Sequence, residues 1–228
     1  MKKLVIPILF SSLVIAGCKN GCNKNGDTGE SEDSNGSAVE NIDSLAAMQA
    51  AMSDSVRALQ NKDSALTRIT RQVLTIFKNK QYSQLNSLIH PQEGVRFSPY
   101  ATVSPEDNKF SREAFHRLVT IQKNKKISWG SYDGSGDPIE LTPAEYFERF
   151  VYDGNFLHPT QYDINNFIKT GNATNNLKAS YAGSDFTESH EDGKPQNGGI
   201  DWKSVRLVFK QWEGKYYLVG IVHDQWTI

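Results

Sequence analysis

The alternation of apolar and polar residues predicts most of the secondary structure of this chain. Apolar residues recur every three or four positions through residues 41–60 and again through 66–77, which is the spacing of one helix face. The polar residues at 61–64 either end one helix and cap the next, or lie exposed on a single long helix. The stripe at 41–60 is compatible both with a coiled-coil stalk and with a helix packed on its own domain.

Shorter signals follow along the chain. We expect helices at 82–89, 111–122 and 142–152, the last because Thr142, Pro143 and Glu145 match an N-cap, a first-turn proline and a capping box. Strands are expected at 94–102, 126–132 and 177–188, with irregular chain at 133–138 and 153–177.

The C-terminal end carries the clearest strand signal. Residues 205–209 and 216–222 alternate, and Glu213-Gly214 lies between them as a turn, which predicts a long antiparallel hairpin. Gly220 within the second strand marks either a bulge or a point where another group approaches the backbone.

This order of elements predicts an α+β fold, with N-terminal helices packed on a curved antiparallel sheet that ends in the long hairpin. The plan resembles the cone of the nuclear-transport-factor-2-like and cystatin-like folds, which implies a pocket between helices and sheet but no function.

The first eighteen residues form a separate pattern. Two lysines precede an apolar run, Leu4–Ile15, and two small residues stand directly before Cys18. A charged start, about 7–15 apolar residues and small residues at the cleavage site are typical of a secretory signal, whereas a membrane span needs about 20 apolar residues. The segment resembles the lipobox of bacterial lipoproteins, which implies cleavage after residue 17 and a lipid on Cys18. The alternative is an ordinary signal with an incidental cysteine.

The lipobox resemblance implies a cell-envelope protein whose membrane partner is reached through the acyl chains on Cys18. Lys19 stands where an inner-membrane retention aspartate would be, which indicates the outer membrane in a Gram-negative cell. Residues 19–37 lack aliphatic and aromatic side chains, which predicts a disordered tether. The acidic half of the tether is either solvated charge or a surface-export signal, and we expect no role for Cys22.

The predicted organisation is therefore a signal peptide at 1–17, a lipidated tether at 18–40, an amphipathic helix or stalk at 41–62 and a globular domain at 63–228. Without residues 1–17 the chain loses two lysines and has 23 basic and 26 acidic residues, a formal charge of −3, which is too small to imply a nucleic-acid partner and argues against a polybasic membrane patch. The only two cysteines are Cys18 and Cys22, so the globular domain is expected to fold without a disulfide.

Three long stretches resemble a family of uncharacterised bacterial lipoproteins and secreted domains. They run from His90 to Tyr100, from Trp129 to Asp153, and from Arg206 to Ile228, and include the words HPQEGVRFSPY, WGSYDGSGDPIELT and LVGIVHDQWTI. Together they span most of residues 82–228. The resemblance implies no activity for the chain.

His223, Asp224, Gln225 and Trp226 are the best candidates for chemistry, because they gather an imidazole, a carboxylate, an amide and an indole at the end of the last strand. Alternation places His223 and Gln225 on one face and Asp224 and Trp226 on the other. The candidate catalytic residues are His223, Asp224 and Asp153, and the candidate ligand-binding residues are Arg96, Tyr152 and Trp226. A purely structural role for all of them is the competing interpretation.

No metal or cofactor site is predicted. Asp133 and Asp137 begin like a calcium-binding loop, but Pro138 and Ala144 stand where such a loop needs glycine and glutamate. The five histidines do not have zinc-ligand spacing. The sequence therefore favours a lipid-anchored, non-enzymatic binding module for an unknown ligand or envelope partner; the alternative is a small-molecule hydrolase or isomerase that uses His223 with a nearby aspartate.

Overall fold

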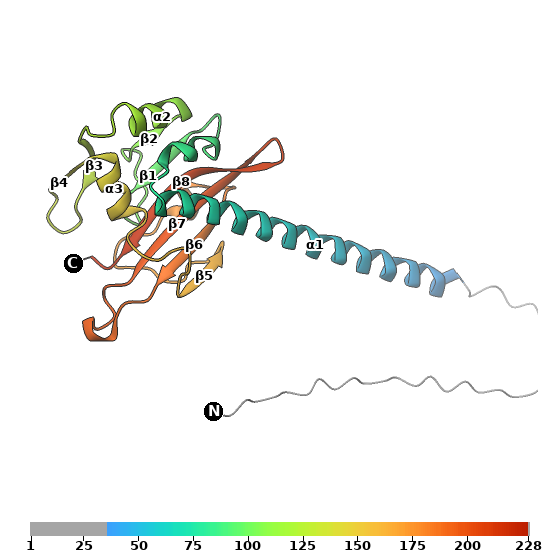
Figure 1. The fold of residues 1–228 in the computed structure, drawn as a ribbon. Helices are drawn as coiled ribbons and strands as arrows, with labels where there is room; N and C mark the ends of the chain where they lie inside the picture. Colours follow the sequence, from blue (N-terminus) through green and yellow to red (C-terminus); the bar gives the residue numbers. More distant parts are fainter. Residues whose placement is uncertain (1–35, 228) are drawn as a thin grey trace, which may run out of the picture. The chain divides into compact units, whose positions relative to one another are not determined.

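The computed structural model describes residues 36–227, and the expected signal peptide and most of the expected tether lie outside them. The described chain is α+β, with a six-stranded sheet in the order β2-β1-β8-β7-β6-β5 (Figure 1). The strands of this sheet are β1 (Val95–Ser98), β2 (Lys109–Phe110), β5 (Gln161–Ile164), β6 (Asp185–Glu191), β7 (Lys203–Trp212) and β8 (Lys215–Gln225). A separate hairpin pairs β3 (Ile127–Ser131) with β4 (Pro138–Leu141).

The sheet is antiparallel except at one pair. β1 runs parallel to β8, with Phe97 opposite Ile221, while all other strand pairs of the sheet are antiparallel, as the sequence predicted. A parallel pair needs a long crossover connection, and here the whole chain between β1 and β8 supplies it. The pairing could not be read from the local pattern because the two strands are far apart in sequence.

Helix α1 (Gly36–Lys78) is a single helix, so the polar residues 61–64 lie on it and do not divide it. It begins at Gly36, inside the range 18–40 that was expected to be tether. The contacts divide the chain between Gln49 and Ala50, and the second unit, Ala50–Ile228, holds the sheet. In that unit, α1 residues from Leu66 to Phe77 are buried at helical spacing, which fixes the C-terminal part of the helix to the domain. Among residues 36–227, no helix meets the length and hydropathy that a membrane span requires.

The remaining helices follow from local capping signals. Ser111 caps α2 (Arg112–Thr120) by accepting a hydrogen bond from the Ala114 N–H at 3.1 Å. Thr142 and Glu145 form the predicted capping box of α3 (Pro143–Phe150), with the Thr142 N–H donating to Glu145 at 2.8 Å. Such caps satisfy backbone N–H groups that have no partner inside the helix. The segment expected to be helical at 82–89 is the 3₁₀ helix η1 (Tyr82–Ser87).

The region 153–188 differs most from the prediction. It contains β5 inside the expected irregular stretch, and the expected strand at 177–188 is instead α4 (Leu177–Ser180) followed by β6. The Asn175 side chain accepts a hydrogen bond from the Leu177 N–H, which favours a helical turn at that point. β5 is an edge strand whose residues are polar or only partly buried, so it lacks the alternation that marks a strand in sequence. A second short 3₁₀ helix, η2 (Pro195–Asn197), precedes β7.

The hairpin β7–β8 confirms both readings of Gly220. The register shifts by one residue between Val208 and Phe209, which places a bulge on β8 beside Gly220. A Cβ atom on Gly220 would lie 2.4 Å from the Tyr181 hydroxyl oxygen, so only glycine lets this tyrosine pack on the strand. The turn is the predicted Glu213-Gly214, and both residues have positive φ, as the tight hairpin turn requires.

Aromatic side chains fill the space between the helices and one face of the sheet. Trp129 and Tyr146 stack with centroids 3.9 Å apart, and Phe97 packs between Phe115 and Phe147. All five are at most 1% exposed. The cone pocket expected on this side is therefore occupied by the core itself.

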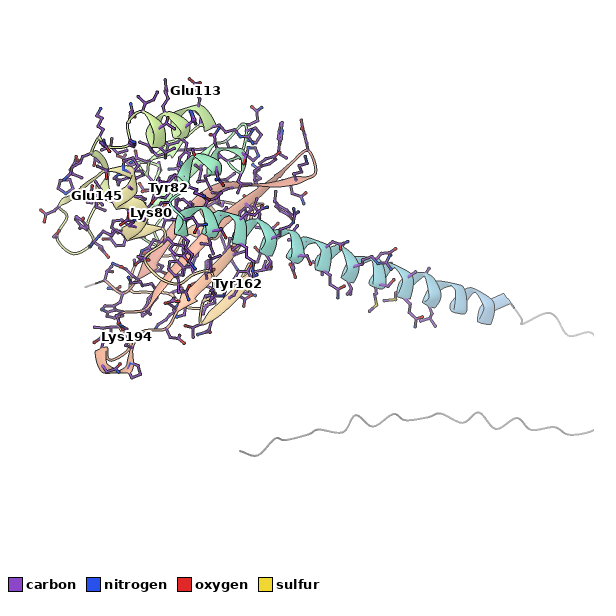
Figure 2. All side chains as sticks on the ribbon, in the orientation of Figure 1. Lys80, Tyr82, Glu113, Glu145, Tyr162 and Lys194 are labelled. Atoms are coloured by element: carbon purple, nitrogen blue, oxygen red, sulfur yellow. The ribbon has the colours of Figure 1, made fainter. Side chains whose placement is uncertain are left out.

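Two polar contacts tie the C-terminal part of α1 to neighbouring elements, through Lys80 and Tyr162, which are labelled in Figure 2. Lys80, just after the helix, pairs with Glu148 of α3 at 2.5 Å, and Tyr162 of β5 donates a hydrogen bond to Thr67 of α1 at 3.3 Å. Both pairs are exposed, so each adds little stability compared with the buried apolar face.

Replacing Gly220 by alanine tests the close approach of Tyr181. We expect Gly220→Ala to lower the free energy of unfolding by about 1–3 kcal/mol in urea denaturation, because the new methyl group overlaps the tyrosine ring. The control is the same substitution in a Tyr181→Leu background, where the cost should be much smaller. An equal cost in both backgrounds would rule out this contact as the reason for the glycine.

Candidate functional site

The end of β8 separates the two leading candidates. His223 and Asp224 are adjacent and fully buried, and the strand directs their side chains to opposite faces of the sheet. His223 faces the helices, where its ring meets the Phe150 ring edge-on at 5.8 Å. Asp224 faces the other side, where it meets Arg206. The two residues therefore belong to different clusters, and Asp224 does not orient His223.

His223 is instead paired with Asp153, the other aspartate singled out from the sequence. Its Nε2 atom lies 3.2 Å from Asp153 Oδ1, and Lys203 Nζ lies 2.7 Å from Asp153 Oδ2. Lys203 also donates to the Asp153 carbonyl oxygen at 3.0 Å. These contacts join the chain just after α3 to strands β7 and β8.

The electrostatics of this cluster favour the ionised form of Asp153. Burial pushes the pKa of Asp153 up, but the hydrogen bond from His223 and the Lys203 ammonium outweigh it and hold the pKa below its usual range. A shallow cleft of about 490 Å³ reaches Asp153 and Lys203 but is not lined by His223. His223 is 0% exposed, and its Nδ1 atom has no hydrogen-bond partner among the described residues. The arrangement can hold the end of α3 on the sheet, but the cleft does not bring a substrate into contact with the His223 imidazole.

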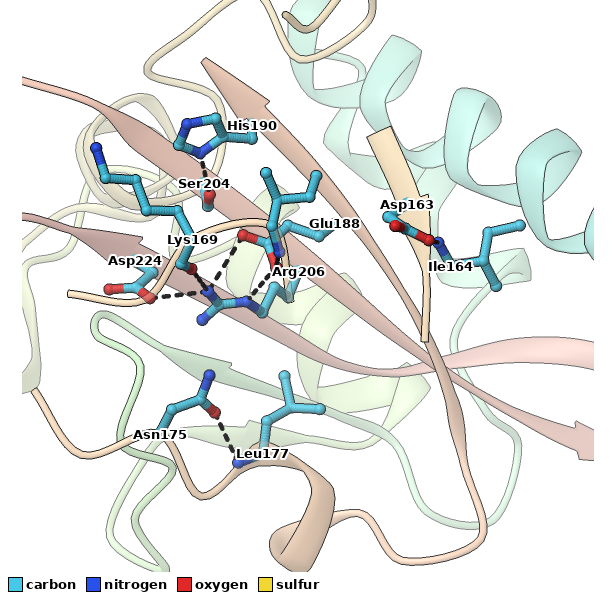
Figure 3. Close-up of polar contacts among 11 residues, drawn as sticks. Asp163, Ile164, Lys169, Asn175, Leu177, Glu188, His190, Ser204, Arg206 and Asp224 are labelled. Atoms are coloured by element: carbon cyan, nitrogen blue, oxygen red, sulfur yellow. Dashed lines mark hydrogen bonds and ion pairs between the residues drawn. The ribbon is translucent and has the colours of Figure 1, made fainter. Parts of the chain in front are cut away.

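Asp224 belongs to a buried ion cluster centred on Arg206 of β7 (Figure 3). Arg206 Nη2 lies 2.8 Å from Asp224 Oδ2, and Arg206 Nε donates to Glu188 of β6 at 2.9 Å. The same Nη2 also donates to the Lys169 carbonyl oxygen at 2.7 Å. All three side chains are at most 1% exposed. One guanidinium thus joins three strands and the segment that covers them.

The covering segment comprises residues 165–182. Its Phe167 ring stacks on Phe186 of β6. The Arg206 guanidinium also lies over the Phe167 ring, 5.0 Å from its centroid. Gly171 packs against Asp224, where a Cβ atom would lie 3.2 Å from the carboxylate oxygen. Because this segment excludes water, burial raises the pKa of Asp224, and Arg206 opposes the rise. The cluster holds two carboxylates against one cation, so it depends strongly on Arg206.

A second polar pair extends the same face of the sheet. His190 Nδ1 lies 2.8 Å from Ser204 Oγ, and His190 Nε2 lies 3.2 Å from Asp192. Burial lowers the pKa of His190 despite the nearby Asp192 carboxylate. None of these residues was predicted from the sequence, although residues 188 and 190 and residues 204 and 206 stand two apart, which is the spacing of one strand face.

The three candidate ligand-binding residues do not converge. Arg96 of β1 donates to the Ser104 carbonyl oxygen and lines a small cleft of about 290 Å³ with Tyr181. Tyr152 is half-buried and packs edge-on against Phe156, and Trp226 is 47% exposed after β8. Of the three, only Arg96 lines one of the five cavities described here within residues 36–227.

The largest concavity described lies elsewhere, between α1 and η1, and is called the α1–η1 groove below. It measures about 940 Å³. Its lining combines two arginines, one carboxylate, several uncharged polar side chains and two aliphatic ones, among them Arg68, Arg71, Asp63, Gln72, Gln81, Gln84, Ser87, Ile76 and Leu88. A second hollow of about 720 Å³ shares four of these residues and continues to Tyr216 and Tyr217 of the hairpin. Neither hollow includes any of the residues singled out as candidates from the sequence.

Arg68 and Arg71 are unusual within this groove. Both side chains are exposed, and neither guanidinium forms an ion pair or a hydrogen bond within the described chain. By contrast, Lys62 on the same helix is engaged with Asp185 at 2.6 Å. Arg68 and Arg71 carry no distinctive signal in the sequence, because polar residues at helical spacing are the ordinary solvent face of an amphipathic helix.

No cluster of three or more potential metal ligands occurs among residues 36–227. The loop at 133–138 is a turn held by its own side chains: Asp133 accepts from the Gly134 N–H, and Ser135 accepts from the Asp137 N–H. These side chains are used for local turn hydrogen bonds, as is typical of Asx and Ser turns.

Removing the Arg206 cation tests the buried cluster. We expect Arg206→Met to lower the free energy of unfolding by about 3–5 kcal/mol at neutral pH, because it leaves Glu188 and Asp224 buried without a counter-charge. The matched control is Arg206→Met combined with Glu188→Leu and Asp224→Leu, which should recover most of the loss, as measured by urea denaturation.

The pH dependence gives an independent check of the same cluster. The pKa of Asp224 is raised in the folded state, so the folded chain binds its proton more readily than the unfolded chain does. The contribution of Asp224 to stability is therefore largest below its ordinary pKa and decreases as pH rises through the raised value. Asp224→Asn should remove this term, so its stability relative to the parent should increase with pH above about 4. A pH-independent difference would contradict the assignment.

Comparison with known proteins found no match of this chain to a family, to a curated protein or to a solved structure. The likeness to nuclear-transport-factor-2-like cones thus stays a prediction, and the function is argued from the site alone.

Proposed function

We propose that this protein is a lipid-anchored component of the bacterial cell envelope that binds an anionic ligand in the α1–η1 groove and catalyses no reaction. The anchor is argued from the sequence at Met1–Cys18, and the ligand class from the free guanidinium groups of the groove. The two parts of the proposal are independent and are tested separately.

The anchor rests on the order of residues before Cys18. A charged start, an apolar run and two small residues precede the cysteine, as a lipoprotein signal requires. Two or more acyl chains hold a protein on a bilayer firmly, whereas one chain holds it only marginally. The lipid on Cys18 would then attach the folded domain to the outer membrane through the residues that precede α1.

Substitution of each cysteine separates lipidation from incidental thiol chemistry. Cys18→Ala should abolish incorporation of an alkyne-labelled fatty acid and move the protein from the membrane fraction to the soluble fraction. Cys22→Ala is the matched control and should do neither, because the lipid is expected only on the residue at the cleavage site. Unchanged labelling and fractionation of Cys18→Ala would contradict the anchor.

The observation that carries the binding function is the unpaired pair Arg68 and Arg71 on the wall of the largest described groove. They stand one helical turn apart, so their side chains project from the same face of α1. A guanidinium offers several N–H donors in a planar fork that fits carboxylate and phosphate oxygens. Gln72 and Gln84 add amide donors and acceptors, while Ile76 and Leu88 add apolar surface.

These side chains suit a ligand that carries carboxylate or phosphate groups on a partly apolar framework. Specificity for such a ligand comes from a few placed polar groups over an apolar surface, which is the usual composition of a binding site. The groove has no histidine, cysteine or paired carboxylate in its lining, so it offers no nucleophile assisted by a base. The chemistry present is that of binding.

Titration with inorganic phosphate and with acetate tests the groove with minimal probes. In the detergent-solubilised full chain, the Nε–H signals of Arg68 and Arg71 should shift saturably with either anion. The matched control is Arg57, which is exposed on the same helix outside the groove. Arg68→Gln should abolish the saturable response, and Arg57→Gln should preserve it. Equal responses of all three arginines would indicate general screening and would contradict the site.

The alternative, a small-molecule hydrolase or isomerase, rests on the 3.2 Å contact between His223 Nε2 and Asp153 Oδ1. A general base must reach the proton of a bound substrate. His223 is enclosed by the aromatic core and lines none of the cavities described above, so the geometry favours binding over this alternative.

A further inference from the structure

A small cleft lies where strands β1, β2 and β8 meet the end of the covering segment, and is called the Arg96 cleft below. It measures about 290 Å³, which is near the lower end of the range for small-molecule sites. Its polar lining includes Arg96, Lys109, Tyr181, Ser104 and Glu93. β1 lies between β2 and β8 in the sheet (Figure 1). The cleft shares no lining residue with the α1–η1 groove.

The Tyr181 hydroxyl group is the first unusual feature of this cleft. Its oxygen is buried, and it has no hydrogen-bond partner among the described residues. The glycine at position 220 lets this hydroxyl lie against β8, because a Cβ atom there would come within 2.4 Å of the oxygen. A buried hydroxyl without a partner destabilises a fold, so such a group calls for an acceptor from outside the chain. That acceptor is a water molecule or a ligand, and the neighbouring charges decide between them.

Arg96 brings further donors to the same cleft. Its Nη1 atom donates to the Ser104 carbonyl oxygen, which fixes the side chain, while no partner of Nε or Nη2 is found within residues 36–227. Burial raises the pKa of Tyr181, and the Arg96 guanidinium close by opposes that rise. The guanidinium therefore lies beside the unpaired hydroxyl and keeps part of its planar set of N–H donors free.

The charges around the cleft favour an anion over a water molecule. Lys109 of β2 is exposed, lines the cleft and forms no ion pair within the described chain. The only carboxylate in the lining, Glu93, is paired with Lys210. The carboxylate of Asp107, next to the cleft, already accepts a hydrogen bond from the Ser104 N–H at 2.9 Å. The cations of the lining therefore exceed its carboxylates, and water alone would leave this positive charge unbalanced.

We propose that the Arg96 cleft is a second binding site, which takes the carboxylate or phosphate group of a small molecule. The oxygens of this group accept hydrogen bonds from the Tyr181 O–H and the free Arg96 N–H groups, and the Lys109 ammonium balances the charge. Val103 and Val219 add apolar surface for the rest of the molecule. This inference does not rest on the α1–η1 groove or on the lipid.

Anion titration of a chain with a disabled α1–η1 groove tests the cleft by itself. In the detergent-solubilised full chain with Arg68→Gln and Arg71→Gln, the Arg96 Nε–H signal and the Tyr181 ring signals should shift saturably with inorganic phosphate or acetate. Tighter binding of phosphate would support a phosphoryl ligand, and tighter binding of acetate a carboxylate ligand. The Arg57 Nε–H signal is the reference and should not saturate, because Arg57 lines none of the five cavities.

Tyr181→Phe separates a binding role from a structural one, because it removes only the hydroxyl group. It should weaken anion binding by about tenfold, while the urea midpoint without the anion stays the same or rises. Tyr152→Phe is the matched control. The Tyr152 hydroxyl is also buried without a partner among the described residues, but it lines none of the five cavities, so anion binding should not change.

Lys109→Gln tests the contribution of the exposed cation. It should weaken anion binding by about threefold, as expected for a charge in contact with solvent. Lys123→Gln removes the same charge from an exposed position that lines none of the five cavities, and should have no effect.

Three results would overturn the proposal. The first is the absence of a saturable Arg96 shift with both anions, and the second is an equal shift at Arg57, which would indicate general screening. The third is a Tyr181→Phe chain that binds anions as well as Tyr152→Phe does, which would show that the hydroxyl meets only water. None of these results bears on the α1–η1 groove, which is tested in the chain that keeps Arg68 and Arg71.

Discussion

The structure depends on one buried cation, the Arg206 guanidinium, which lies between Glu188 on β6 and Asp224 on β8. Placing charged groups in a dry interior costs several kcal/mol per ion, and the cost is offset only where the partners are close and further hydrogen bonds are made. Arg206 meets that condition because it also donates to the Lys169 carbonyl oxygen. The cluster fixes the register of three strands and seats the covering segment on them.

This constraint decides where a ligand or partner can bind. One face of the sheet is closed by the aromatic core around Phe97 and Phe147, and the other by the Arg206 cluster and residues 165–182. The residues that looked most reactive in the sequence, His223 and Asp224, lie inside these two layers and hold them together. The surface that we propose for the binding function lies outside both layers, in the α1–η1 groove that Arg68 and Arg71 line.

The sequence predicted those features that depend on neighbouring residues. The Thr142 capping box and the β7–β8 hairpin with its Gly220 bulge are local, and each carries a distinctive residue pattern. The parallel pairing of β1 with β8 and the edge strand β5 depend on distant partners and leave no local periodicity. The sequence named His223 and Asp153 as candidates because of their residue types. The Arg206 cluster and the α1–η1 groove could not be predicted, because they arise only when separate elements are brought together.

The central claim is that the Arg206 cluster and its cover form a permanent part of the fold and are not a site that opens to a ligand. Hydrogen–deuterium exchange of the full chain tests this most directly, because amides in a segment that opens exchange faster than those in the surrounding core. The account predicts that the hydrogen-bonded amides of the covering segment, such as that of Tyr181, exchange about as slowly as those of β6–β8. Fast exchange across residues 165–182 with the strands still protected would show a lid over the Arg206 cluster and would contradict the account.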